Sequence, residues 1–373
     1  MARIPSVKAF TGTSVEVLNA IRNSATTNYR NFVPFAQPDS ESVKKIGAVI
    51  MQYPALQNEF LNALINRIGL VIVTNKLYSN PWSMFKKGML EMGESIEEIF
   101  VNIAKVSQFD PYVAEETVFQ RQIPDVRATF HIMNYQKFYK DTISEDQLRQ
   151  AFLSWDGVTD LISRIVNSMY TAANYDEFLV MRYAFARQFI DGNVGSQAYT
   201  LTGVASTDNR EISKIIKSLS DNYTFLSDSY NIAGVMTHCD KDKQYLISTV
   251  DFNAGLDVDS LAFAFNMDKI QFAGNRVAVP SFGFSAAEMN RLADIFTGDS
   301  TYTAFTDGEL ATLNNVQAVL LSGDYFRVYD NLLKFTEIYN SEGLYWNYCL
   351  HCWKTVSTSP FENVTALVAE SGD

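Results

Sequence analysis

The spacing of apolar residues predicts two helices in the first half of the chain. Behind Pro54, apolar residues recur every three or four positions as far as Gly69, which predicts an amphipathic helix of about four turns. A capping box opens at Ser144, and the apolar residues behind it predict a second helix that ends near Thr171. At 1.5 Å per residue this second helix is roughly 40 Å long, with Gly157 as a weak point in its middle.

Beyond Gly192 the pattern changes to shorter elements of mixed type. Asp208 and the capping box that opens at Ser285 predict two helix starts. Short buried strands are expected at 276–279 and 316–321. Three further strands are expected near the end of the chain, at 325–329, 344–357 and 364–368. These elements together predict an α+β protein.

Two parts of the chain lack a core-forming period. Pro34 and Pro38 interrupt the first forty residues, which predicts an extended arm with one short helix at about 15–22. Residues 71–126 also contain few periodic apolar positions. Because unsupported loops longer than about 15 residues are rare in compact domains, this second segment predicts a projecting arm that packs on a neighbour.

Composition and charge narrow the class of protein. The 373 residues predict two or three domains, and a hydrophobic fraction of 47% is ample for a large core without disulfides. No apolar run approaches the length of a membrane span, and no signal peptide is recognisable, so we expect neither secretion nor membrane insertion. The net charge of −12 argues against a protein that grips nucleic acid, because the average surface repels phosphate.

Two of the three cysteines lie in the stretch GLYWNYCLHCWKTVS and raise the question of a metal or redox site. In a strand, Cys349 and Cys352 point to opposite faces, so they cannot act as a CxxC redox pair. Cys349 and His351 share a face, and His238 with Cys239 could supply two more zinc ligands. The alternative, ordinary buried thiols in a sheet and a reducing compartment, fits an odd number of cysteines better.

No other motif predicts chemistry. The chain contains no GxSxG, GxGxxG, P-loop or HExxH pattern, so no cofactor and no catalytic residue are expected. The acidic pairs Glu97-Glu98 and Glu115-Glu116 could support acid–base catalysis, but we interpret both as solvated surface charges.

Five long segments in collinear order resemble the major capsid proteins of small short-tailed phages of the phi-29 type. They are VEVLNAIRNSATTNYRNFVP (15–34), QNEFLNALINRIGLVIV (57–73), MFKKGMLEMGESIEEIF (84–100), LDVDSLAFAFNMDKIQFAGN (256–275) and YFRVYDNLLKFTEIYNSEGLYWNYCLHCWKTVS (325–357). The resemblance covers nearly the whole chain. The family's best-known member continues into an immunoglobulin-like domain, whereas this chain ends soon after Val368, so we expect any stabilising role of that domain to be absent or met otherwise.

The resemblance implies a fold of the Hong Kong 97 (HK-97) type. Its parts are then expected as an N-terminal arm at 1–40, an extended E-loop at 71–126, an axial domain at 192–323, and a peripheral domain with a long spine helix at 41–70, 127–191 and 324–373.

The resemblance also implies a structural function without catalysis. Copies of the chain would tile an icosahedral head as pentamers and hexamers around double-stranded DNA, with a scaffolding protein, a portal and other head proteins as further partners. Assembly would take place in the host cytoplasm, and the finished location would be the virion. A zinc-dependent cytosolic enzyme and another ring-forming virion component are the alternatives.

Four residues are candidates for contacts with an adjacent subunit. Trp82, Phe85, Lys86 and Lys87 are expected near the tip of the E-loop, where aromatic anchors would supply most of the association energy. Deletion of residues 80–90 is therefore expected to leave a folded subunit that does not build shells. The acidic balance suggests an inner wall along which DNA slides during packing.

Overall fold

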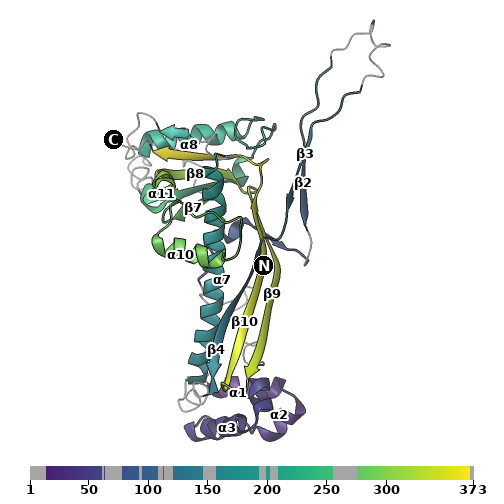
Figure 1. The fold of residues 1–373 in the computed structure, drawn as a ribbon, viewed down its shortest axis with the longest axis vertical. Coiled ribbons are helices and arrows are strands. Elements are labelled where there is room, and N and C mark those ends of the chain that lie inside the picture. The colour runs from purple at the N-terminus through teal and green to yellow at the C-terminus, as the bar shows by residue number, and fades with distance from the viewer. Residues whose placement is uncertain are drawn as a thin grey trace, which may run out of the picture. The chain divides into compact units, whose positions relative to one another are not determined.

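A computed structural model of the chain is shown as a ribbon in Figure 1. The residues that the structure describes are 14–60, 63, 78–91, 95–107, 112, 121–145, 157–192, 199–201, 209–254 and 275–369. The chain forms two compact units. The first unit comprises 1–79, 138–175 and 333–352, and the second comprises 80–137, 176–332 and 353–373.

A group of short helices opens the first unit. These are α1 (Ser14–Ser24), α2 (Thr27–Phe32), α3 (Ser40–Gln52) and a further helical stretch at 54–60. The side chains of Thr26 and Asp39 accept hydrogen bonds from amides in the first turns of α2 and α3, and such caps favour a helix start at these positions. The helix expected from Pro54 is confirmed as far as Phe60, whereas its predicted end lies outside the described residues.

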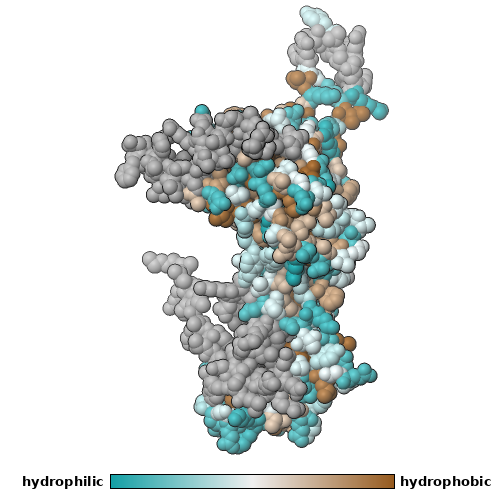
Figure 2. Space-filling model, turned by 60° about the vertical axis from the view of Figure 1, so that its left-hand side comes forward, coloured by the Kyte–Doolittle hydropathy of each residue, from teal (hydrophilic) through white to brown (hydrophobic). Residues whose placement is uncertain are grey.

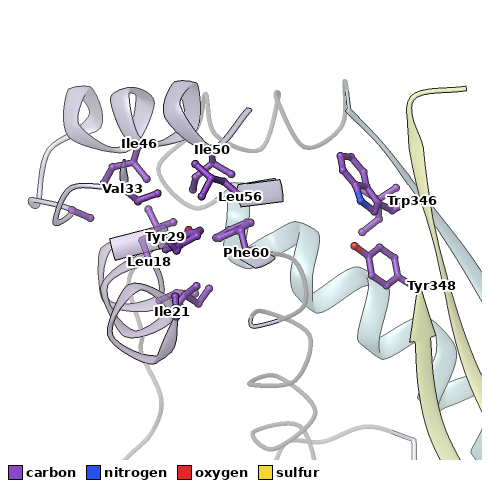
Figure 3. Close-up of a cluster of buried hydrophobic side chains, with 14 of the residues drawn as sticks. Leu18, Ile21, Tyr29, Val33, Ile46, Ile50, Leu56, Phe60, Trp346 and Tyr348 are labelled. Atoms are coloured by element: carbon purple, nitrogen blue, oxygen red, sulfur yellow. The ribbon is translucent and has the colours of Figure 1, made fainter. Parts of the chain in front are cut away.

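The helices bury one side in a shared hydrophobic core. Figure 3 shows Leu18, Tyr29 and Ile46 converging from α1, α2 and α3. Trp346 and Tyr348 from strand β10 (Tyr345–Thr358) belong to the same core. The short helix expected at about 15–22 is confirmed as α1. The extended course expected for the rest of the arm is wrong at 27–32, which form α2, and Tyr29 and Val33 pack into the same core.

A long helix, α7, runs through residues Gly157–Ile190. Its 34 residues give a length of roughly 51 Å at 1.5 Å per residue. The prediction of a long helix is confirmed, but its predicted end is wrong, since α7 continues 19 residues beyond Thr171. In residues 172–190 both apolar and polar side chains are buried or half-buried all around the helix. An amphipathic period therefore does not reveal this part of the helix in the sequence. Residues 146–156 lie outside the described part of the chain.

Two larger sheets contain most of the strands. The order in the first sheet is β1 (Lys86–Met89), β9 (Phe326–Asn340), β10 and β4 (Tyr135–Ser144). The order in the second is β5 (Tyr199–Leu201), β11 (Val364–Ala369), β8 (Val316–Ser322), β6 (Gln244–Thr249) and β7 (Arg276–Val279). The five strands predicted in the C-terminal third are confirmed, although β9 is ten residues longer than the expected 325–329.

Helices of the second unit accompany its five-stranded sheet. They are α8 (Asn209–Tyr223), α10 (Ala286–Ile295) and α11 (Asp307–Asn314). Ile212 and Ile216 of α8 share a buried cluster with Leu246 of β6 and Leu320 of β8. The capping box predicted at Ser285 is present at the start of α10, whereas Asp208 lies outside the described residues.

The two compact units are not the same division as the predicted peripheral and axial domains, whose boundaries remain a prediction. Among the helices that the structure describes, none is long and apolar enough to cross a membrane.

Candidate subunit-contact surface

A hairpin in the second unit forms a two-stranded sheet separate from the two larger ones (Figure 1). Its strands are β2 (Ile96–Val101) and β3 (Val126–His131), which pair antiparallel with Ile96 opposite His131 and Val101 opposite Val126. One more hydrogen bond, from the Asn102 amide to the Asp125 carbonyl at 2.9 Å, extends the pairing beyond the strands.

The two faces of the hairpin differ in character. Because side chains alternate along a strand and directly paired residues share a face, the register assigns each residue to one side. One side carries Glu98, Phe100, Arg127 and His131, and we call it the anchored face because all four contact other parts of the second unit. The other side, which we call the apolar face, carries Ile99, Val101, Val126 and Phe130 with Ala128, and Glu97 lies on the same side, paired with Phe130.

The side chains of the apolar face are exposed. Ile99, Val101, Val126 and Phe130 are between 51% and 63% exposed. Figure 2 shows brown, hydrophobic atoms on the hairpin at the upper right of the view. A contiguous set of exposed apolar side chains on a soluble subunit typically marks an interaction surface.

Polar side chains hold the base of the hairpin to the long strands β9 and β10. His131 contacts Glu98 through Nε2 at 2.9 Å and Ser357 through Nδ1 at 2.7 Å. The other Glu98 oxygen accepts hydrogen bonds from Arg327 and, at 3.0 Å, from Ser359 Oγ. We call these five residues the base network; His131 and Ser359 are almost fully buried within it.

The base network keeps Glu98 ionised. Burial alone would raise the pKa of this carboxyl group, but hydrogen bonds from His131, Arg327 and Ser359, with the positive charge of Arg327, lower it to about 2. The sequence interpretation of Glu98 as a solvated charge is therefore wrong, because the side chain is inside a hydrogen-bonded network. Glu97, on the other face, is exposed as expected. Glu115 and Glu116 lie outside the described residues.

Two more contacts on the anchored face lie farther along the hairpin. The rings of Phe100 and Phe361 stack with centroids 5.6 Å apart and an interplanar angle of 24°. Arg127 donates a hydrogen bond to the carbonyl of Ala233. The hairpin is thus attached at its base and at its middle, and all of these contacts lie on the anchored face.

Trp82 and Phe85 do not lie where the sequence analysis expected them. Both are fully buried, and Trp82 packs against Phe178 and Phe326 with centroid distances of 5.5 and 5.4 Å. Their expected position near the exposed tip of the E-loop is wrong, because the segment 80–90 packs into the second unit before the hairpin begins. A deletion of residues 80–90 would remove part of this core, so we now expect it to destabilise the subunit, and its outcome remains a prediction.

Lys86 and Lys87 follow this buried segment and form ion pairs within the unit. Lys86 contacts Glu177 at 3.1 Å and Asp330 at 2.7 Å. Burial alone would lower the pKa of Lys86, but these two carboxylates raise it. Lys87 pairs with Asp324. A contact of either lysine with an adjacent subunit remains a prediction.

The cysteine-rich stretch forms strand β10, as predicted. Cys352 is buried and Cys349 is half-buried on the opposite face. His351 lies 3.0 Å from the hydroxyl of Thr336. Burial raises the pKa of Cys239 to about 11, so this thiol is uncharged near neutral pH. Within the described part of the chain, no three or more His, Cys, Asp or Glu side chains are grouped as a metal site would require.

The apolar face of the hairpin was not predicted from the sequence. The alternation in IEEIFV over 96–101 was a usable signal for a strand, but Ile99 and Val101 cannot be assigned to the exposed side without the register of β2 against β3.

The chain is similar to known phage capsid proteins. The family model described as "Phi29-like phage major capsid protein" matches residues 18–368. The major capsid protein of Bacillus phage B103 is 37% identical over 95% of this chain and 73% of its own length, and that of Bacillus phage PZA is 34% identical over 96% and 73%.

Solved capsid structures share the fold at low identity. A chain from the capsid of Staphylococcus phage Andhra has a TM-score of 0.59 at 15% identity and covers 80% of this chain and 86% of its own. A chain of native bacteriophage P68 has a TM-score of 0.55 at 15% identity over 79% and 86%. These neighbours confirm the predicted α+β fold of the HK-97 type. The matched relatives are structural proteins, so neither a zinc enzyme nor another catalytic function is supported. The chain belongs to the Phi29-like phage major capsid protein family.

Proposed function

We propose that copies of this major capsid protein join as pentamers and hexamers of an icosahedral head, and that the apolar face of the hairpin makes a contact between neighbouring copies. The observation that supports this contact is the exposure of Ile99, Val101, Val126 and Phe130 on one side of a hairpin whose other side is already attached. Burial of apolar side chains stabilises an interface by about 25 cal/mol per Å² removed from water. A second copy is the expected occupant because the family builds shells from many copies of one chain.

The other partners follow from the resemblance and from charge. We expect packaged double-stranded DNA to be held without sequence-specific contacts, since the net charge of −12 opposes strong phosphate binding. A scaffolding protein, a portal and further head proteins would take part in assembly in the host cytoplasm.

The test removes apolar atoms from the hairpin without touching the anchored face. In the double variant Ile99→Ser and Val101→Ser, we expect at least a tenfold higher protein concentration for assembly, because a loss of about 1.4 kcal/mol per contact is a factor of ten. Sedimentation velocity would measure assembly, and electron microscopy would show whether the products are closed shells, rings or tubes.

A matched control keeps the apolar area at the same two positions. The exchange variant Ile99→Val with Val101→Ile has the same number of apolar atoms and should assemble as the unmodified chain does. Thermal unfolding of the unassembled subunit should be nearly unchanged in both variants, since surface substitutions usually alter stability by less than about 0.5 kcal/mol. Normal assembly of the double serine variant would show that the apolar face is not a subunit contact.

A further inference from the structure

The hairpin needs support from the rest of the subunit to have a fixed direction. An isolated two-stranded hairpin is at best marginally stable in water, and its strands carry no hydrophobic core of their own. Its direction and the side it offers to solvent must therefore come from contacts at its anchored face. Those contacts are the base network, the Phe100–Phe361 stack and the hydrogen bond from Arg127 to Ala233.

We propose that Glu98 is a positioning residue, which sets the direction of the hairpin before assembly so that the apolar face is presented to the next copy. This inference rests on the proposed function of that face. Glu98 lies on β2 and contacts His131 on β3, Arg327 on β9 and Ser359 beyond the end of β10. One carboxylate thus joins both strands of the hairpin to the two long strands that support it.

The chemistry of the network favours a directional role over a purely stabilising one. A guanidinium group and an imidazole ring are planar donors, so their hydrogen bonds to a carboxylate fix angles as well as distances. Replacing a buried ionic network by apolar residues often leaves stability unchanged or improves it, and the best-attested benefit of such a network is the selection of one arrangement. Glu98 and Arg327 are 14% and 18% exposed in their side chains, so water competes little for these bonds.

The alternation of the strands connects this role to the apolar face. Glu98 and Ile99 are adjacent in β2 and therefore point to opposite sides. As long as Glu98 is held by Arg327, Ile99 faces solvent. Loss of the network would leave the hairpin held by the Phe100–Phe361 stack and the hydrogen bond from Arg127 to Ala233. Its base would then move more freely, and the direction of the apolar face would vary more.

The test compares Glu98→Ala with Glu97→Ala, an adjacent exposed carboxylate on the other face of the same strand. In the unassembled subunit, hydrogen exchange of the amides at 96–101 and 126–131 should become at least tenfold faster in Glu98→Ala, while exchange in β8 stays unchanged. Glu97→Ala should leave exchange at all three segments as it is. Glu98→Gln keeps a hydrogen-bond acceptor but loses the charge, so it should lie between the two and serves as the variant to study if Glu98→Ala does not fold.

Assembly of the same variants provides the second measurement. We expect Glu98→Ala to yield few or irregular shells compared with the unmodified chain. Glu97→Ala is the control for hydrogen exchange and not for assembly, because Glu97 lies on the same side of the hairpin as the apolar face. Unchanged hairpin exchange in both Glu98 variants would overturn the positioning role. Faster exchange with normal shells would show that a preset direction is not needed. Both results are independent of the serine variants of the apolar face. Normal assembly of those serine variants would count against the proposed contact. The exchange measurement would still decide the role of Glu98 in the subunit.

Discussion

The segment 80–90 and the hairpin that follows it both contain large apolar side chains, but these are buried in the segment and exposed on the hairpin. Trp82 and Phe85 are fully buried in the second unit, whereas Ile99 and Phe130 are more than half exposed. Composition does not separate the two regions. The difference is that the first region packs between α7 and β9 of its own subunit, while only one side of the hairpin has such support.

On the proposed function of the apolar face, this comparison explains how a capsid subunit can be stable alone and still need its neighbours. Apolar side chains that pack between a helix and a sheet of the same subunit complete a core within one copy. The apolar residues on the outer side of the two-stranded sheet are exposed among the residues that the structure describes, so we expect their covering layer to come from a second copy. The first region should therefore control the stability of the subunit, and the hairpin should control assembly.

The largest effect is expected from truncating the buried aromatic ring of the first region. Trp82→Ala leaves a cavity among Phe85, Phe178 and Phe326 and should lower the free energy of unfolding by about 3–5 kcal/mol, as large-to-small core substitutions do. Chemical denaturation of the unassembled subunit measures it.

Met84, two residues away and 49% exposed, provides the control. Met84→Ala should change the free energy of unfolding by less than about 0.5 kcal/mol. Equal effects of Trp82→Ala and Met84→Ala would contradict the assignment of this segment to the core.

A second large effect is expected at Glu177, the buried carboxylate that contacts Asn80 and Lys86 of the segment 80–90. Glu177 on α7 accepts a hydrogen bond from Asn80 at 2.7 Å and pairs with Lys86 at 3.1 Å and with Lys354. Burial alone would raise the pKa of Glu177, but the two lysines lower it, so this carboxylate stabilises the fold above its ordinary pKa and less so as the pH falls. Glu177→Gln should cost about 3 kcal/mol at pH 7, because it leaves lysines without their buried partner.

An exposed ion pair gives the comparison for this loss. Glu41 and Lys45 on α3 are 3.0 Å apart, with side chains 79% and 72% exposed. Glu41→Gln should change stability by less than about 0.5 kcal/mol, as exposed pairs on helices usually do. A similarly small loss for Glu177→Gln, measured by denaturation at pH 7, would show that the buried network adds little to subunit stability.

The elements of this fold could be predicted from the sequence where a local signal sets them. The alternation in 344–357 predicted strand β10 and the two faces of its cysteines, and the capping box at Ser285 predicted α10. The fold type came from the collinear resemblance of long segments. The end of α7 could not be predicted, because its C-terminal half is surrounded by protein and has no polar side to reveal a period.

The candidate site was harder to predict because it depends on pairing across the chain. Glu98 and Arg327 are 229 residues apart in sequence, and nothing in the pair Glu97-Glu98 shows which carboxylate will be buried. Trp82 is a residue type that is common among interface anchors, but a tryptophan is equally suited to a hydrophobic core. Only the three-dimensional packing of 80–90 distinguishes the two.

The smallest effect is expected where the hairpin meets the subunit, at Glu362. Burial, with the nearby negative charges of Asp324 and Glu98, raises the pKa of this carboxyl group. The positive charge of Arg327, 4.0 Å away, lowers the pKa but offsets this rise only in part. Because the pKa of Glu362 is raised in the folded state, the folded protein holds this proton more tightly than the unfolded chain does. Ionisation of Glu362 therefore lowers the stability of the fold as the pH rises above the ordinary pKa of a glutamate. Glu362→Gln should therefore stabilise the subunit by roughly 0.5–1 kcal/mol at pH 7, and the gain should vanish near pH 4. Denaturation at both pH values measures it, and a loss of stability at pH 7 would show instead that Glu362 supports the base network through Arg327.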